Sequence, residues 1–349
     1  MASTQNSHRD ATQAGEPLLR TVDLTRHFRL GGMFSKQVLH AVDDFDLEIH
    51  EREIVALVGE SGSGKSTVAR LLAGVDRPTR GESYYRGRPI SKLRSRKDLM
   101  AYRGEVTMVF QDPFSAFNPV FRVSHGVGRN LILHRPELSR EQRRQEAERV
   151  FESVGLSAKM LQRFPFEMSG GERQRVGFAQ ALAVRPKLIL ADEPVSMLDV
   201  SIRAGVLNMM AGLRDQEGVS ILYITHDLAS ARYVADRIVV LYAGQTAESG
   251  PTEAVLGDPK HPYTQLLLSA AGDPGEKDES VSADTGEPPR VINPGEGCRF
   301  RWRCPLAIEK CSHVTPLPRP IGSVEVACHV ATGDTEDLSE PAGKASISR

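Results

Sequence analysis

Residues 59–66 of the chain carry a spacing of glycine, lysine and serine that is typical of phosphate binding. The segment Gly-Glu-Ser-Gly-Ser-Gly-Lys-Ser fits the pattern G-x-x-x-x-G-K-[ST], and it follows an apolar run and precedes a helical pattern. Glycines let the backbone N–H groups turn toward a phosphate, and the N-terminus of a helix adds a positive dipole end. The pattern predicts a nucleoside triphosphate site in which Lys65 reaches the β- and γ-phosphates and Ser66 ligates Mg²⁺. The residues predicted to contact the nucleotide here are Gly59, Ser61, Gly62, Ser63, Gly64, Lys65, Ser66 and Thr67.

Two consecutive carboxylates follow a second apolar run, at residues 188–191. Asp192 is predicted to hold Mg²⁺ through the water shell of the metal, and Glu193 to polarise an attacking water. Most Asp-Glu pairs are solvated surface groups. The end of a buried strand in a protein with a phosphate-binding loop favours the catalytic interpretation instead.

A second Ser/Gly-rich turn, Ser169-Gly170-Gly171, also stands where a helix begins, so its N–H groups could bind a phosphate. The segment from residue 168 to 172 resembles the signature sequence L-S-G-G-Q of ABC ATPases, with Met168 in place of Leu and Glu172 in place of Gln. In that family this element closes over ATP held by the opposite subunit. The resemblance therefore implies that hydrolysis requires a dimer.

The other motifs of this family occur in the family's order. Gln111 matches the Q-loop, which contacts Mg²⁺; Asp199 matches the D-loop, which crosses the dimer interface. His226 matches the switch histidine at the γ-phosphate, although a lone histidine is more often a satisfied surface or core residue. Phe28 is the candidate for stacking on adenine, with Phe34 as a substitute and a core aromatic as the alternative. The resemblance implies catalytic roles for Lys65, Glu193 and His226.

Elements that could position these residues are visible in the hydropathy pattern. Short apolar runs at 54–58, 188–191, 221–225 and 238–242 alternate with helical patterns, which predicts a parallel α/β sheet. A helix with Ser139 as its N-cap and Gly155 near its end is predicted within a helical insertion. The resemblance implies an α/β fold: a RecA-like P-loop core with an antiparallel β subdomain and a helical subdomain at about 113–170.

Composition divides the rest of the chain. Residues 1–16 and 331–349 are rich in small and acidic residues and are predicted to be disordered tails. The ATPase domain is predicted to span 17–271, followed by a linker at 272–289 and a small Cys-rich module at 290–330.

The four cysteines all lie in that module, as Cys298-x5-Cys304-x6-Cys311-x16-Cys328. The module, and the His-Pro-Tyr-Thr segment at 261–264, are similar to the C-terminal part of oligopeptide and dipeptide permease ATPases. Some of these bind a [4Fe–4S] cluster, which four cysteines suit. Structural zinc and unligated thiols remain alternatives, with His313 and His329 as substitute ligands. Pro262 at the start of a helix is ordinary capping chemistry, so the segment serves as a family marker.

The resemblance implies the ATP-hydrolysing motor of a di- or oligopeptide importer at the cytoplasmic face of the membrane. Its partners would be a second ATPase subunit of a different type, two integral-membrane permease subunits contacting residues 113–123, and an extracytoplasmic peptide-binding protein. Nickel or oligosaccharide import by the same engine remains open, because nothing in such a subunit reads the cargo. A net charge of −1, one cassette and no coiled coil disfavour a soluble ABC ATPase acting on nucleic acid.

Overall fold

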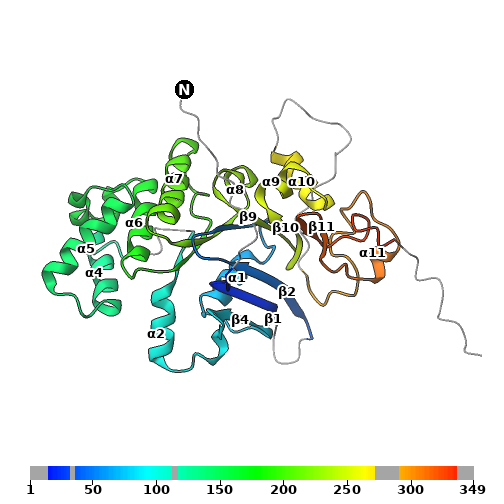
Figure 1. Cartoon of the computed structure of the whole chain (residues 1–349), viewed down its shortest axis with the longest axis horizontal. Helices are drawn as coiled ribbons and strands as arrows, with labels where there is room; N and C mark the ends of the chain where they lie inside the picture. The colour runs from blue at the N-terminus through cyan, green and yellow to red at the C-terminus, as the bar shows by residue number, and fades with distance from the viewer. Residues whose placement is uncertain (1–14, 32–35, 112–116, 272–290, 336–349) are drawn as a thin grey trace, which may run out of the picture.

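A computed structural model describes residues 15–31, 36–111, 117–271 and 291–335. Figure 1 shows the helices α4, α5 and α6 at one end of the molecule and α11 at the other. The strands lie between these ends. Within the described residues no helix is both long and apolar enough to cross a bilayer. The predicted linker, most of both predicted tails and Phe34 lie outside these ranges.

The central sheet has eight strands in the order β11-β12-β10-β9-β3-β8-β7-β6. Its parallel part confirms the strands predicted from the apolar runs. β3 and β7 are buried along their whole length, as strands covered on both faces must be. The strands are β3 (Ile54–Val58), β6 (Val106–Val109), β7 (Leu188–Asp192), β8 (Ser220–Thr225), β9 (Arg237–Tyr242), β10 (Gln245–Pro251), β11 (Arg319–Ile321) and β12 (Val324–Val326).

A second sheet of four strands is antiparallel throughout, in the order β2-β1-β4-β5. It packs on the central sheet through a shared core that contains Leu19 and Phe45 from this sheet, Leu57 from β3 and Leu72 from α1. The strands are β1 (Leu19–Arg29), β2 (Val38–Ile49), β4 (Arg80–Tyr85) and β5 (Arg88–Pro89). The sequence therefore folds as a P-loop core with an antiparallel β subdomain.

Helices cover the central sheet and form the insertion between β6 and β7. The α-helices are α1 (Lys65–Leu72), α2 (Arg96–Glu105), α4 (Val123–His134), α5 (Arg140–Ser153), α6 (Gly170–Leu182), α7 (Val200–Gln216), α8 (Leu228–Val234), α9 (Thr252–Gly257), α10 (Pro262–Ala271) and α11 (Lys310–His313). Three short 3₁₀ helices are η1 (Ile90–Lys92), η2 (Ala158–Gln162) and η3 (Pro165–Glu167).

The helical insertion begins its second helix at the predicted cap. Ser139 Oγ accepts a hydrogen bond from the N–H of Gln142, and the Gln142 side chain accepts one from the N–H of Ser139. Gly155, just past the end of α5, has a φ of 71° that glycine adopts without strain. Val150 and Phe151 are fully buried and attach α5 to the core.

Residues 291–335, here the C-terminal segment, are joined to the ATPase domain rather than set apart from it. β12 pairs with β10 in antiparallel fashion, and β11 adds to the outer side of β12. The segment therefore continues the central sheet, where the sequence indicated a module beyond a linker. Its described structure also continues past the predicted boundary at residue 330, because Asp334 forms an ion pair with Lys310 at 2.6 Å.

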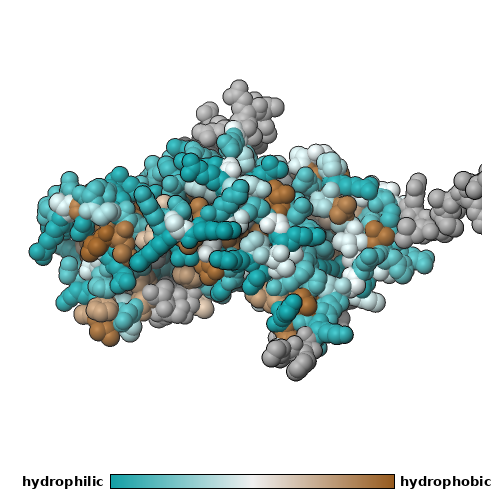
Figure 2. All heavy atoms as spheres, turned by 90° about the horizontal axis from the view of Figure 1, so that it is seen from below, coloured by the Kyte–Doolittle hydropathy of each residue, from teal (hydrophilic) through white to brown (hydrophobic). Residues whose placement is uncertain are grey.

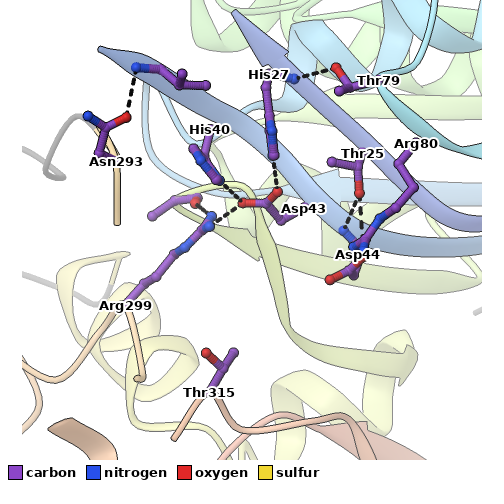
Figure 3. A network of polar contacts seen from close by, with 12 residues as sticks. Thr25, His27, His40, Asp43, Asp44, Thr79, Arg80, Asn293, Arg299 and Thr315 are labelled. Atoms are coloured by element: carbon purple, nitrogen blue, oxygen red, sulfur yellow. Dashed lines mark hydrogen bonds and ion pairs between the residues drawn. The ribbon is translucent and has the colours of Figure 1, made fainter. Parts of the chain in front are cut away.

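A network of polar contacts ties the C-terminal segment to the second sheet (Figure 3). Arg299 contacts the Asp43 carboxylate on β2, and the N–H of Val38 donates to the side chain of Asn293 at 2.9 Å. His27 and His40 contact the same carboxylate of Asp43. Burial would raise the pKa of Asp43, but hydrogen bonds from His27, Arg299 and His40 hold that pKa below its ordinary value.

Candidate functional site

The phosphate-binding loop runs from the end of β3 into α1, as the motif predicts. Gly64 occupies the N-cap position of α1 with a φ of 108°, which side chains rarely adopt. A Cβ atom at Gly64 would lie 2.3 Å from the carbonyl oxygen of Ala41. The glycine at this position is therefore required both by the turn and by the close approach of β2.

Lys65 closes the loop on itself. Its Nζ donates to the carbonyl oxygens of Gly59 at 2.7 Å and Glu60 at 2.8 Å. Burial lowers the pKa of Lys65, while the carboxylates of Glu193, Asp192 and Glu60 act in the opposite direction. The hydroxyl of Ser63 is buried and lacks a hydrogen-bond partner among the described residues. The loop thus contains the Lys65 ammonium group and the unpaired Ser63 hydroxyl, and both can donate hydrogen bonds to a phosphate.

Asp192 ends β7 beside this loop. Burial raises the pKa of its carboxyl group, and a hydrogen bond with the Ser66 side chain works against that rise. Its Oδ1 atom is buried and has no hydrogen-bond partner in the part of the chain that the structure describes. An orphaned buried carboxylate oxygen is costly unless a cation or ordered water satisfies it. Asp192 and Ser66 therefore fit a Mg²⁺ site, because both offer the oxygen ligands that this ion prefers.

The carboxylate of Glu193, the next residue, contacts two side chains from other parts of the chain. Gln111, just after β6, donates Nε2–H to Glu193 Oε2 at 3.0 Å. His226, just after β8, brings its Nδ1 to 3.3 Å from Glu193 Oε1. Glu193 itself has a φ of 45°, and its N–H donates to the carbonyl of Ile224 at 2.9 Å. Three predicted site residues thus meet at the carboxyl ends of parallel strands, where α/β proteins place their ligands.

The Ser/Gly turn forms the N-terminus of α6. Ser169 Oγ accepts from the N–H of Glu172 at 3.3 Å, and Glu172 Oε2 accepts from the N–H of Ser169 at 2.8 Å. The two departures from the family signature both have structural roles, since Glu172 completes this capping box and Met168 is buried. Gly171 is also buried, and a Cβ atom there would lie 2.3 Å from Ile202 Cγ2 on α7.

The signature turn and the D-loop do not join their own phosphate-binding loop. No hydrogen bond among the described residues connects Ser169, Gly170, Gly171 or Asp199 to residues 59–66. Asp199 is exposed at the N-cap of α7, between Met197 (62% exposed) and Val200 (80% exposed). Asp199 and its neighbours Met197 and Val200 lie on an accessible surface, as a contact with a second subunit would require.

Phe28 lies near the end of β1 and is half-buried. The guanidinium carbon of Arg26 lies 4.4 Å from its ring centroid, so one face of the ring has a cationic neighbour. None of the described contacts ties Phe28 to the phosphate-binding loop. Its role in adenine stacking stays a prediction.

The cysteines are all free thiols, with Cys311 and Cys328 buried and Cys298 and Cys304 half-buried. The N–H of Cys298 donates to the carbonyl of Cys311 at 2.8 Å, which brings the first and third together. Burial raises the pKa of Cys298 to about 11, and the other three thiols contribute to that rise. Among the described residues the compact group of possible metal ligands is His27, His40 and Asp43, whose ligand atoms lie within 4.8 Å of one another.

Sequence reasoning missed residues that support the phosphate-binding loop from the far end of the chain. Tyr263, in the segment interpreted only as a family marker, accepts a hydrogen bond from the N–H of Glu60 at 3.0 Å. Arg303 binds the carboxylate of Glu60 through both terminal nitrogens. The cluster of arginines around the cysteines was the available signal, but spacing alone does not say which carboxylates they meet.

Comparison with known proteins places the chain in a family. A family model described as "ABC transporter" matches residues 42–196, and one described as "Oligopeptide/dipeptide transporter, C-terminal region" matches residues 247–311. The "Probable peptide ABC transporter ATP-binding protein y4tS" of Sinorhizobium fredii is 41% identical over 343 residues, covering 95% of each chain. The "Dipeptide transport ATP-binding protein DppF" of Escherichia coli is 38% identical over 323 residues, covering 91% of this chain and 96% of its own.

A solved structure agrees with these sequence matches. The dimeric ATP-binding cassette MJ0796, bound to ADP and Pi, superposes with a TM-score of 0.60 at 28% identity, and the match covers 67% of this chain and 98% of the cassette. The chain therefore belongs to the ABC transporter family, as an ATP-binding protein with the C-terminal region of oligopeptide and dipeptide transporters.

Proposed function

We propose that this chain is the ATP-hydrolysing motor subunit of a bacterial importer for di- and oligopeptides. The observation that carries the catalytic part is the meeting of Gln111, Glu193 and His226 beside Asp192 and Lys65. Three separate loops place these groups together, and such convergence suits reaction at a phosphate rather than surface solvation. The cargo rests on the relatives, whose names specify peptide or dipeptide transport.

Each residue has a distinct task in this proposal. Lys65 and the N–H groups of the loop bind the β- and γ-phosphates, while Ser66, Asp192 and Gln111 would hold the magnesium. When bound, the Mg²⁺ neutralises charge that develops on the phosphate oxygens. Glu193 orients and deprotonates the attacking water. His226, which lies beside Glu193, contacts the γ-phosphate.

The site is completed by a second subunit. Ser169, Gly170 and Gly171 at the start of α6 cover the nucleotide bound by the partner, and Asp199 crosses the interface. The exposed position of Asp199 and its apolar neighbours supports this arrangement. The solved cassette that this chain resembles is a dimer. We propose a partner of a different but related type.

Contact with the membrane subunits is proposed for the region after the Q-loop. Phe110, Val120 and Phe121 are 54%, 73% and 45% exposed, and they flank residues 112–116, which lie outside the described ranges. Figure 2 shows apolar side chains gathered toward the end of the molecule that carries α4 and α5. Two permease subunits would cover this surface at the cytoplasmic face of the membrane, while an extracytoplasmic binding protein selects the peptide.

The cysteines are proposed to hold a [4Fe–4S] cluster. All four belong to one segment, and the thiols influence one another's ionisation. No three of the four sulfur atoms all lie within 4.8 Å of one another. Tetrahedral zinc, with Zn–S bonds of about 2.3 Å, would need sulfur atoms closer than that, whereas a cluster spaces its thiolates more widely. The proposal is tested by iron and sulfide content and the visible absorption of the anaerobically purified chain.

The function is tested by Glu193→Gln. We expect kcat for ATP hydrolysis to fall by about 10²–10⁴-fold, because the positioned base is lost, while ATP affinity changes little. Uptake of labelled di- and oligopeptides should fall in parallel in cells that lack other peptide permeases, and nickel uptake should persist.

Glu51→Gln is the matched control, because Glu51 is an exposed carboxylate that pairs with Arg86 at the surface. Its hydrolysis and uptake should match wild type. Normal hydrolysis by Glu193→Gln would contradict the assignment of the base. Normal peptide uptake with hydrolysis abolished would contradict the cargo and leave only the ATPase.

A further inference from the structure

The loop between the first two cysteines, residues 298–304, packs against the ATPase domain through three of its side chains. Arg299, Phe300 and Arg303 point inward; Phe300 is 2% exposed and both arginine side chains are 10% exposed. Trp302 is 79% exposed, and the guanidinium of Arg301 lies over its ring at 4.7 Å. The loop therefore presents one buried face of defined chemistry to the ATPase domain.

Two side chains, Phe300 and Arg299, hold this loop in place. Phe300 packs edge-on against Tyr242 with ring centroids 5.2 Å apart, and it also contacts Tyr263 at 5.5 Å. Arg299 binds Asp43 on β2 and the carbonyl of Ala243 (Figure 3). Aromatic packing and a buried ion pair on adjacent residues leave the loop little freedom to shift.

The remaining inward side chain, Arg303, reaches the phosphate-binding loop. Its two terminal nitrogens donate to Glu60 Oε2 at 2.7 Å and to Glu60 Oε1 at 2.9 Å. Such bidentate pairs between arginine and a carboxylate are the stronger class of charged hydrogen bond. Glu60 is only 25% exposed, so solvent screens the pair less than it would at the surface.

Glu60 is part of the phosphate-binding loop and is bound at every polar group. Its N–H donates to Tyr263, its carbonyl accepts from Lys65 Nζ, and its carboxylate binds Arg303. The charge of Glu60 also acts on Lys65. Left unpaired, this negative charge would lie close to the phosphates of a bound nucleotide and repel them.

We propose that Arg303 is a positioning residue for nucleotide binding, which acts by neutralising the charge of Glu60 at the start of the phosphate-binding loop. The inference rests on the proposed ATP site and extends it to the C-terminal segment. It gives that segment a part in ATP affinity that is independent of what the cysteines bind. If the pair only held the loop in place, replacing either Arg303 or Glu60 would weaken ATP binding. If Arg303 neutralises Glu60, replacing Arg303 weakens ATP binding and replacing Glu60 does not.

The experiment measures the Kd for MgATP by equilibrium binding on full-length chains. Arg303→Gln should raise Kd about tenfold, because Glu60 then repels the phosphates, and added salt should reduce this deficit. Glu60→Gln should bind ATP as tightly as wild type or more tightly, since Arg303 then faces the phosphates alone. Combining both substitutions gives a neutral pair that can still hydrogen-bond, and its Kd should return to within about twofold of wild type.

Arg301→Gln is the control, because it removes the same charge from the same loop at a residue that contacts the Cys298 carbonyl and the Trp302 ring rather than Glu60. Its Kd should equal that of wild type. A wild-type Kd for Arg303→Gln, or a double variant as weak as Arg303→Gln, would overturn the inference while leaving the ATP site intact. If the wild-type chain itself fails to bind ATP, the proposed function fails instead. Should Arg303→Gln not fold, Glu60→Gln decides alone, since weaker binding there contradicts charge neutralisation.

Discussion

Asp192 and Glu193 are consecutive in the chain, but their carboxylates meet different surroundings. Asp192 is buried at the end of β7, with one oxygen unpartnered among the described residues, while Glu193 binds Gln111 and His226. An unpartnered buried oxygen suits a cation, and an oriented, partly accessible carboxylate suits a base. Successive side chains at the end of a strand point in different directions, and Glu193 also has a left-handed backbone with a φ of 45°.

This difference predicts separable effects of the two residues. Asp192→Asn should raise the Mg²⁺ concentration for half-maximal ATPase activity by about tenfold or more, because a charged oxygen near the ion is lost. Glu193→Gln should leave the Mg²⁺ dependence of nucleotide binding unchanged. Titrating Mg²⁺ at saturating ATP for activity, and with fluorescent ATP for binding, distinguishes the two. Equal shifts in both variants would contradict the division of roles.

At this scale the sequence predicts the residues that belong to motifs, because their spacing reflects a local backbone shape. Lys65, Asp192 and Glu193 follow strands whose apolar runs are visible in the sequence. The pair of Glu60 and Arg303 spans 243 positions, and no periodicity links them. Such a contact depends on how β10 and the C-terminal segment fold back, which charge patterning alone does not determine.

Among the elements, α6 shows how a signature sequence also serves folding. Ser169 and Glu172 form a capping box at its N-terminus. Glu172→Gln should change the free energy of unfolding by no more than about 0.5 kcal/mol, because glutamine can accept the same hydrogen bond from the N–H of Ser169. Glu172→Ala loses that bond and should cost about 1 kcal/mol. Urea denaturation measures both, and equal losses would show that the charge rather than the hydrogen bond stabilises the helix.

Elements with a strong hydrophobic periodicity could be predicted from the sequence, and very short elements could not. The parallel strands and the helix after Ser139 follow from apolar runs and a capping pattern, and the structure has them. β11 and β12 have three residues each, too few to reveal alternation. The sequence therefore predicts a separate C-terminal module, although β12 pairs directly with β10.

At the scale of the whole molecule, the protonation of His261 makes stability depend on pH where the C-terminal segment packs on the ATPase domain. It is 3% exposed and packs near Phe300, and its Nδ1 accepts from the N–H of Tyr263 at 3.0 Å. Burial lowers its pKa from 6.5 to about 4, so the folded chain keeps the ring neutral where the unfolded chain protonates it. Stability should therefore fall as the pH drops below 6.5.

The size of this effect follows from the two pKa values. Between pH 7 and pH 5 we expect His261 to cost about 2 kcal/mol of unfolding free energy. His261→Asn keeps an acceptor near the N–H of Tyr263 but does not titrate, so its stability should depend less on pH over this range. Urea denaturation at several pH values measures the difference. An unchanged pH dependence in the variant would exclude His261 as the cause.

The pairing of β12 with β10 also bears on how the chain is made. β10 has its outer side open until residues 324–326 have been synthesised, and an open strand edge invites pairing with other chains. Once the hairpin docks, the edge passes to β11, a strand of three residues that includes Arg319 and Pro320. Proline lacks an N–H to offer a neighbour. These late-synthesised strands therefore replace an aggregation-prone edge with one that resists further pairing.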